Sequence, residues 1–399
     1  MLIYYRFNNF CSFNCESEFS MSAPTGKVKR RFPDNYVETP EGFDLLKSAV
    51  IVGENAGGKS NFIDSLKYLK SLFVINSQVK AIRPYINVAS LNSDKKPVQK
   101  FELCFLAENG KVYIYELQID ESGIILERLQ YVKRKKANPV AVFEIRRNED
   151  GLGDVIVQNK HNALLSKQKF MMESDWMNNV RIGLFITKCA LLGNQDALAV
   201  VDWMTNTLCP EGLATDKEDD VVRQEADMKI LEDARYLEIF RMVDYSICGI
   251  EIDKEKPYSK SVIIRKDENG DSFKRELQMD SAGVREFFSW AVYIFRVVYE
   301  NKVVFADEMD KVLNPILSDR VIAFINGVEH KGQFVFSTHN VLHLDLKTYM
   351  KEQIYFVTKD RQQLTSEMYS LADFPEVRYE TTKIYEFYMK GILGGTAFE

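Results

Sequence analysis

The stretch IVGENAGGKSN, residues 51–61, places the tightest constraint on the fold of this chain. Gly53 is followed after four residues by Gly58, Lys59 and Ser60, which is the spacing of a phosphate-binding loop, or P-loop. Glycines in such a loop let backbone N–H groups converge on an anion at the N-terminus of a helix, where the helix dipole also favours negative charge. The alternative is a glycine-rich turn that binds nothing, and the flanking residues decide between the two.

Both flanks have the pattern that a P-loop requires. Leu45–Gly53 is an apolar run suited to a buried central strand. After the loop, apolar residues recur at the spacing of one helix face, at Phe62, Ile63, Leu66, Leu69 and Phe73. We therefore expect ATP as ligand, with Lys59 reaching its β- and γ-phosphates and Ser60 binding Mg²⁺. The residues expected to contact the nucleotide are Gly53, Glu54, Asn55, Ala56, Gly57, Gly58, Lys59, Ser60 and Asn61.

A second candidate element, KVVFADEMD, spans Lys302–Asp310. Its apolar residues predict a buried strand with two carboxylates at its C-terminal edge, where doubly wound sheets bind ligands. Asp307 would then bind Mg²⁺ through water, and Glu308 would accept a proton from an attacking water as general base. An acidic pair after a strand can also be a solvated turn, so this element gains weight from the P-loop.

A third element, FVFSTHN, spans Phe334–Asn340 and predicts another buried strand. His339 follows the end of that strand and could donate a hydrogen bond to the γ-phosphate. A histidine in such a place is otherwise a structural residue. The other histidines, which we expect at the surface or in the core, are His161, His330 and His343.

Composition limits the classes of partner and compartment. The chain has 52 Lys and Arg against 58 Asp and Glu, a net charge of −6, so no global basic excess calls for a nucleic-acid partner. Six scattered cysteines suggest a reducing compartment, and Cys11 and Cys15 are interpreted as strand residues rather than zinc ligands. The apolar run Trp290–Glu300 is shorter than the ~20 residues of a membrane span. We expect a soluble, cytoplasmic protein without a membrane partner.

The periodicity of the chain changes along its length. Residues 1–22 alternate as an antiparallel hairpin, 23–44 have loop composition, and 101–132 predict an antiparallel meander. The region from His161 to Tyr245 has helical spacing, and Asn269-Gly270 predicts a hairpin turn. We divide the chain into an N-terminal lobe, a helical insertion and a C-terminal lobe, with boundaries 1–155, 156–250 and 251–399.

The three motifs together, GENAGGKSN, VVFADEMD and FVFSTHN, resemble those of the ABC-type ATPase heads of the SMC, recombination-repair and OLD group. The resemblance implies an α/β fold, the ABC-type P-loop NTPase head, with a mixed sheet core, an antiparallel β subdomain and a helical insertion. It also implies a signature segment, matched by MDSAGVREFF with Ser281 and Gly283. In that group the signature reaches across a dimer to the γ-phosphate held by the other subunit.

Further residues follow from the same resemblance. The segment VVFADEMD is similar to the strand of this group called Walker B, which carries the acidic residues of the site. The segment after it, DKVLNP, is similar to the D-loop, with Asp310 as its acidic residue. Gln99 is the candidate for the Q-loop glutamine, although it is offset from the expected position, and Gln78 is a weaker candidate. Ala282 stands where many transporters have glycine, which favours the SMC-like branch.

More narrowly, the chain resembles the AAA15/AAA21 ATPases of bacterial anti-phage and abortive-infection loci, including the AbiL and Rlo types and the PARIS ATPase. The opening FNNFCSFNCESEFSM and the late segments QIYFVTKD and MYSLADF carry this resemblance. The chain departs from it at Asn314, where relatives often have His, and at Gly57, where Ser is common.

Three functions are consistent with these motifs. The leading hypothesis is an ATPase that forms a homodimer or higher homo-oligomer around ATP and controls a separate toxin or nuclease effector. The alternative is a DNA-binding repair or recombination ATPase, with phosphate contacts from the basic runs Gly26–Arg31 and Val132–Lys136. The third is a nucleotide-binding scaffold with little turnover.

Overall fold

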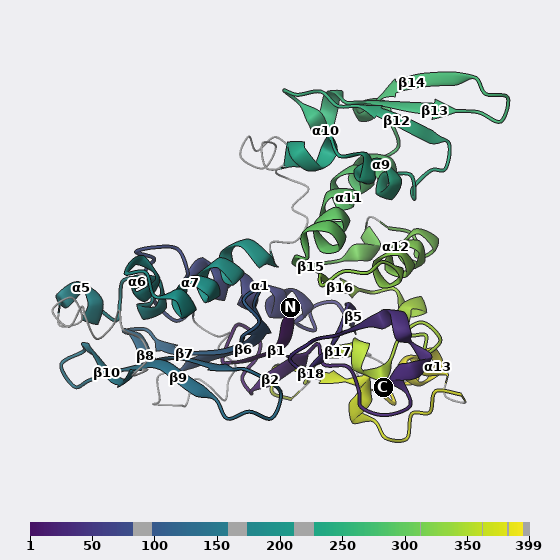
Figure 1. Cartoon of the computed structure of the whole chain (residues 1–399). Coiled ribbons are helices and arrows are strands. Elements are labelled where there is room, and N and C mark those ends of the chain that lie inside the picture. Colours follow the sequence, from purple (N-terminus) through teal and green to yellow (C-terminus); the bar gives the residue numbers. More distant parts are fainter. Residues whose placement is uncertain are drawn as a thin grey trace.

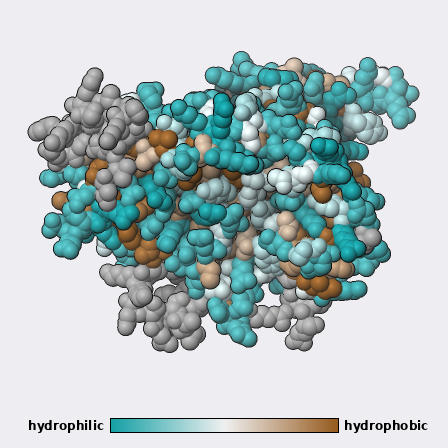
Figure 2. All heavy atoms as spheres, turned by 60° about the horizontal axis from the view of Figure 1, so that its bottom comes forward, coloured by the Kyte–Doolittle hydropathy of each residue, from teal (hydrophilic) through white to brown (hydrophobic). Residues whose placement is uncertain are grey.

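The computed structural model describes residues 1–82, 98–158, 174–210, 227–311, 313–360, 362–380 and 383–393. Two large sheets lie side by side in the lower half of Figure 1, and a smaller three-stranded sheet stands apart at the upper right. A space-filling view of one face shows mainly hydrophilic residues with hydrophobic ones scattered among them (Figure 2). Apolar side chains are thus gathered mainly inside, in clusters that follow the sheets.

The central sheet has six strands in the order β11-β15-β16-β5-β17-β18. The first five strands in this order run parallel, and β18 is antiparallel to β17, so the sheet is mixed. Every residue of β5, β15 and β16 is buried, which explains their unbroken apolar sequences. The bounds are β5 Ser48–Gly53, β11 Leu208–Cys209, β15 Val303–Ala306, β16 Gln333–Thr338, β17 Ile354–Lys359 and β18 Ser366–Ser370.

The second sheet has seven antiparallel strands in the order β10-β9-β8-β7-β6-β1-β2. It contains the predicted N-terminal hairpin and the predicted meander, and both predictions are confirmed. Cys11 and Cys15, predicted as strand residues, lie instead in the connection between β1 and β2. Two further strands, β9 and β10, extend the meander beyond the predicted range. The bounds are β1 Leu2–Asn8, β2 Ser17–Ser20, β6 Gln99–Leu106, β7 Val112–Asp120, β8 Gly123–Val132, β9 Val140–Arg147 and β10 Gly153–Gln158.

Helix α1, Lys59–Ser71, joins the two sheets through Phe62 in its first turn. The Phe62 ring lies 5.9 Å from that of Phe7 on β1, 5.3 Å from that of Phe19 on β2 and 6.0 Å from that of Phe305 on β15. Burial of such a side chain contributes about 1.5–3 kcal/mol, and tilted aromatic pairs add to this. The helix that follows the predicted P-loop is therefore fixed against both sheets.

The helices of the predicted insertion pack on two different cores. Helices α6, Phe185–Leu191, and α7, Gln195–Asp202, contribute to the core of the seven-stranded sheet. Helix α9, Ala234–Phe240, packs instead against α11, Ala282–Glu300, in the core of the central sheet. Residues 159–173 and 211–226 of this region lie outside the described part, and the three-part division remains a prediction.

The three-stranded sheet precedes α11 and has the order β12-β13-β14. Its hairpin turns at Asp267–Asp271, which confirms the turn predicted at Asn269-Gly270. Figure 1 shows that this sheet lies beyond the N-terminal end of α11, away from the central sheet. The bounds are β12 Ile247–Glu251, β13 Val262–Lys266 and β14 Ser272–Glu276.

The stretch 23–44, predicted as loop, also contains short regular elements. Strands β3, Tyr36–Glu38, and β4, Asp44–Leu46, pair over three residues, which is too short for a periodic pattern in the sequence. Further helices of the described part are η1 Lys29–Arg31, η2 Pro33–Asn35, α5 Asp175–Asn178, the π-helix η3 Trp203–Thr207, α10 Pro257–Lys260, η5 Leu277–Met279, η6 Met309–Lys311, α12 Pro315–Gly327, η7 Val341–His343, η8 Lys351–Gln353, η9 Leu371–Asp373 and α13 Ile384–Met389.

These observations confirm the predicted fold class. A mixed, largely parallel α/β sheet carries the predicted P-loop between β5 and α1, and an antiparallel β subdomain packs beside it. Strand β16 pairs with β5, β15 pairs with β16, and the other two sequence motifs overlap these two strands. None of the helices in the described part is long and apolar enough to cross a bilayer.

Candidate functional site

The predicted P-loop leaves β5 at Gly53 and enters α1 at Lys59. Two of its glycines are required by close neighbours. A Cβ on Gly53 would lie 2.1 Å from the Val357 carbonyl oxygen, and a Cβ on Gly58 would lie 2.4 Å from Ser366 Oγ. Gly58 also has a φ of +123°, which side-chain-bearing residues rarely adopt. It is the N-cap of α1 and no side chain caps the helix there, so nearby N–H groups are available to an anion.

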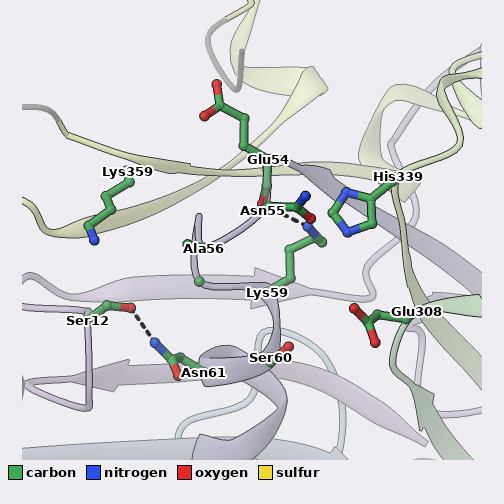
Figure 3. A pocket seen from close by; sticks show the side chains of 11 residues that line it. Ser12, Glu54, Asn55, Ala56, Lys59, Ser60, Asn61, Glu308, His339 and Lys359 are labelled. Carbon is green, nitrogen blue, oxygen red and sulfur yellow. Dashed lines mark hydrogen bonds between the residues drawn. The ribbon is translucent and has the colours of Figure 1, made fainter. Parts of the chain in front are cut away.

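A cavity of about 290 Å³ opens at this loop. Figure 3 shows Glu308 and His339 on one side of the loop, and Ser12 and Lys359 on the other. The ends of four strands, β5, β15, β16 and β17, and the β1–β2 connection thus meet at one cavity. Its lining residues are Ser12, Glu54, Asn55, Ala56, Gly58, Lys59, Ser60, Asn61, Glu308, His339 and Lys359.

Lys59 is buried and folds back over the loop. Its Nζ donates to the carbonyl oxygens of Gly53, at 2.7 Å, and Glu54, at 3.0 Å. Burial lowers the pKa of the ammonium, while the carboxylate of Asp307 acts in the opposite direction. A phosphate oxygen in the cavity would offer this ammonium a stronger, charge-assisted partner than the two carbonyls.

Ser60, which lines the cavity, is in direct contact with Asp307. The Ser60 hydroxyl donates to Asp307 Oδ2 at 2.7 Å. The other carboxylate oxygen, Oδ1, accepts from Ser337 Oγ, and Ser337 Oγ accepts from the backbone N–H of Glu308 at 2.8 Å. One hydroxyl and one carboxylate are hard oxygen ligands, and Mg²⁺ typically binds few protein groups beside water and phosphate oxygens. The residues present therefore fit the predicted Mg²⁺ site.

Glu308 has an unusual backbone conformation at the edge of the cavity. Its φ of +53° lies in the left-handed region, which is uncommon for residues other than glycine, and such conformations cluster at functional sites. His339, at the end of β16, lines the same cavity. Its backbone N–H donates to Asp310 Oδ1 at 3.0 Å, so Asp310 holds the loop that carries the histidine.

Three predicted nucleotide-binding residues lie away from this cavity. Gln99 is fully buried at the start of β6, where its side-chain amide bonds to the backbone of Ile82 and Asn9. The weaker candidate, Gln78, forms an isolated bridge with Ile182. Neither glutamine lines the cavity.

The other two predicted residues that lie away from the cavity, Ser281 and Gly283 of the signature, are exposed at the N-terminal end of α11. Ser281 is the N-cap of this helix and accepts from the Val284 N–H, while nothing lies within 4 Å of a Cβ on Gly283. Helix α11 has 19 residues, a length of ~28 Å, whereas β15 has four residues and spans only ~13 Å. The signature end of α11 therefore projects beyond the sheet edge where the cavity opens.

Two lining residues, Ser12 and Lys359, were not predicted from the sequence. Ser12 lies in the connection between β1 and β2, and Lys359 is the last residue of β17. The parallel pairing of Val357 with Gly53 brings Lys359 next to the P-loop. A basic residue at the end of an apolar strand was the available signal for Lys359, whereas Ser12 gave none.

The remaining histidines in the described part are core residues. Burial lowers the pKa of His330 to about 4, and its Nε2 lies 2.7 Å from the Ile325 carbonyl oxygen. Burial also lowers the pKa of His343, whose ring packs against Phe336. His161 lies outside the described residues.

Comparison with known proteins gives a partial family match. A family model described as "AAA domain, putative AbiEii toxin, Type IV TA system" matches residues 48–166, which is less than half of the chain. The match contains the P-loop and most of the seven-stranded sheet, but neither Ser281 nor Asp307. A search of curated protein sequences found no match.

Among solved structures, two SMC heads align with most of the chain. The SMC head domain from Thermotoga maritima is 14% identical, with a TM-score of 0.41, and the alignment covers 92% of this chain and 98% of that one. An SmcHead bound to the C-winged helix domain of ScpA is also 14% identical, with a TM-score of 0.44 and coverage of 92% and 97%. With scores below 0.5, the fold assignment depends on the topology described above.

Proposed function

We propose that this protein is an ATPase that binds ATP and Mg²⁺ at the cavity between β5, β15 and β16. The observation that carries the proposal is the contact of Ser60 with Asp307, with Glu308 and His339 at the same cavity. A Gly-rich turn without a ligand would not need a hydroxyl, two carboxylates and a histidine gathered from three distant segments. The partial match to an AAA domain supports the same activity.

Each residue has a role that follows from its position. The N–H groups at Gly58 and Lys59 and the Lys59 ammonium would bind the β- and γ-phosphates. Ser60 and Asp307 would hold Mg²⁺, which neutralises phosphate charge when bound. Figure 3 shows Glu308 on one side of the loop and Ser12 and Lys359 on the other, so the γ-phosphate would lie toward Glu308 and the nucleoside toward Ser12 and Lys359.

Hydrolysis then needs a base and a donor at the γ-phosphate. Glu308 would accept the proton of the attacking water, and His339 would donate a hydrogen bond to a γ-phosphate oxygen. The hydrogen bond from Ser337 Oγ to Asp307 Oδ1 leaves Oδ2 facing Ser60, which orients the carboxylate for its role toward Mg²⁺.

Ser281 and Gly283 support a homodimer as the hydrolytic form. They are exposed at the end of a helix that projects past the cavity of the same chain. A second copy, related by a two-fold axis, would place its signature over this cavity and close it against water. Two composite sites would then form per dimer.

We further propose that ATP-dependent dimerisation controls a separate toxin or nuclease in a bacterial anti-phage, abortive-infection system. The description of the family that matches residues 48–166, which names a toxin–antitoxin system, supports this context. Co-expression with the product of the neighbouring gene, followed by phage challenge, tests it. If the Lys59→Ala variant still protects cells from phage, defence does not depend on nucleotide binding and this proposal is wrong.

The test of nucleotide binding uses the full chain, Mg²⁺ and a fluorescent ATP analogue. The parent protein is expected to bind, and Lys59→Ala to lose at least roughly tenfold in affinity, because a charge-assisted phosphate contact disappears. Lys111→Ala, which removes a lysine paired with Asp196 far from the loop, is the matched control. Equal binding by Lys59→Ala and the control would contradict the proposal.

One observation favours direct DNA binding as a second candidate. The residues of the second basic run, 133–136, are all exposed in the β8–β9 turn. In the first run, by contrast, Lys29 pairs with Asp44 at 2.6 Å and Arg31 pairs with Glu380. Salt-dependent retention on duplex DNA that is lost when Lys133, Arg134, Lys135 and Lys136 are replaced by Gln would support this function. Unchanged retention would remove this turn as the contact.

A further inference from the structure

We propose that Ser366 is a positioning residue of the nucleotide site, which holds the P-loop backbone so that an N–H group, and not a carbonyl oxygen, faces the phosphates. This inference rests on the proposed binding of ATP. Ser366 is the first residue of β18 and lies more than 300 positions from the P-loop in the sequence. Its side chain is almost fully buried, with 2% exposed.

Ser366 makes two short hydrogen bonds beneath the loop. Its Oγ donates to the carbonyl oxygen of Gly57 at 2.6 Å, and it lies 2.7 Å from Ser12 Oγ. Ser12 Oγ in turn accepts from Asn61 Nδ2 at 2.7 Å. The backbone of Ser366 is held as well, since its N–H donates to the Ser12 carbonyl oxygen at 2.8 Å.

The two ends of this chain of hydrogen bonds fix its direction. The Asn61 NH₂ group can only donate, and the Gly57 carbonyl can only accept. Each hydroxyl between them has a single hydrogen, so Ser12 accepts from Asn61 and donates to Ser366, which donates to Gly57. This orientation gives each of the three hydrogen bonds a hydrogen, and the reverse orientation does not.

The Gly57 carbonyl decides where the next N–H points. The Gly57 C=O and the Gly58 N–H belong to one trans peptide unit, so they point in opposite directions. With the oxygen held by Ser366 beneath the loop, the Gly58 N–H faces the opposite side, and Gly58 lines the cavity. This peptide unit stands between two glycines, whose backbones rotate easily, so the hydrogen bond is what disfavours the flipped orientation. The flipped unit would turn a carbonyl oxygen toward the phosphates.

The close contact with Ser366 also requires glycine at position 58. A Cβ there would lie 2.4 Å from Ser366 Oγ and 2.9 Å from Ser366 Cβ. The close approach that makes the Ser366 hydrogen bond possible therefore excludes any side chain on the loop at this point.

The test compares two serines of the same strand. Ser370 is also buried in β18, and its Oγ donates to a backbone carbonyl, that of Lys351, away from the P-loop. Ser366→Ala and Ser370→Ala thus each remove one buried hydroxyl from β18. We expect ATP, titrated with Mg²⁺ present, to bind about fivefold more weakly to Ser366→Ala and with parental affinity to Ser370→Ala. In turnover, KM should rise for Ser366→Ala while kcat stays near the parental value, and Ser366→Thr should restore KM.

The outcomes separate this inference from the proposed function. If the parent chain binds no ATP, the proposed function fails and this inference fails with it. If the parent and Ser370→Ala bind ATP and Ser366→Ala binds equally well, the function stands and the inference is overturned. Equal weakening in both variants also overturns it, because the effect would then come from β18 in general. If Ser366→Ala does not fold, as judged by thermal unfolding without nucleotide, Ser366→Cys, whose thiol is a weaker donor, takes its place, with about a twofold loss in affinity expected and no loss overturning the inference.

Discussion

The Ser60 hydroxyl lies 2.7 Å from Asp307 Oδ2, although 247 positions separate the two residues in the chain. Strand β16 lies between β5 and β15, and parallel pairing aligns the ends of the three strands. Ser337, near the end of the middle strand, bonds to the other oxygen of the same carboxylate. The sheet therefore brings together a hydroxyl and an oriented carboxylate that no local segment could supply.

Asp307→Asn should weaken the response of the ATPase to Mg²⁺. The amide keeps the size of the side chain and can still bond to Ser60, but it loses the negative charge that a divalent cation needs. A loss of roughly 10–100-fold in apparent Mg²⁺ affinity is expected. A Mg²⁺ titration of ATP hydrolysis measures it, with Asp150→Asn in an exposed turn as the control. An unchanged titration curve would mean that the metal is held elsewhere.

Glu308→Gln should bind ATP and fail to turn it over. The amide cannot accept a proton from water, and loss of a general base typically lowers the rate by ~10²–10⁴-fold. Because hydrolysis would no longer release the subunits, light scattering should detect an ATP-dependent dimer. Glu300→Gln, at the exposed end of α11, serves as the control for removal of a carboxylate. Parental hydrolysis by Glu308→Gln would refute its role as base, and slow turnover in the parent protein itself would favour the nucleotide-binding scaffold.

Ser281→Arg should prevent ATP-dependent dimerisation and leave ATP binding to the single chain intact. Ser281 is exposed and distant from the cavity of its own chain, so a bulky cation there can obstruct only a second copy. Sedimentation with and without ATP, in the Glu308→Gln background, measures the effect. Gln278→Arg, three residues earlier and also exposed, is the matched control. A Ser281→Arg protein that still dimerises would exclude the signature end of α11 from the interface.

Glu127 should make the protein less stable as the pH rises toward neutrality. Its buried carboxylate accepts from the N–H groups of Phe185 and Ile186 and from the Tyr115 hydroxyl. Burial raises its pKa from 4.5 to about 7, although these hydrogen bonds and Lys188 act in the opposite direction. Between these two values the folded chain binds more protons than the unfolded chain, so the free energy of unfolding falls as pH rises, by up to about 3 kcal/mol.

The comparison with Glu127→Gln isolates this effect from that of the other carboxyl groups. The neutral amide does not titrate, so the difference in unfolding free energy between parent and variant should shift against the parent from pH 4.5 to 7. Urea unfolding at several pH values measures it, and Glu149→Gln, on an exposed turn, should track the parent. A difference independent of pH would show that Glu127 keeps an ordinary pKa in the folded protein.

The sequence predicted those parts of the fold that local patterns encode. The strand, loop and helix around Lys59 and the buried strand before Asp307 have apolar runs or helical spacing, and these elements were predicted. The strand before Lys59 begins at Ser48, because Leu45 and Leu46, predicted in the same strand, belong to β4. Ser366 and Ser12 could not be found this way, because a single serine on a strand or turn acquires its role only through tertiary contacts. The sequence also could not predict that α6 and α9 pack on two different cores. An amphipathic pattern predicts that a helix has an apolar face, but not which surface that face packs against.

The aromatic contacts of Phe62 couple the P-loop to the packing of the two sheets against each other. Loosening the first turn of α1 would expose rings that belong to β1, β2 and β15 at once. The two sheets should therefore melt in a single cooperative transition rather than as independent domains. A ligand that binds only the folded P-loop would then raise the melting temperature of both sheets together.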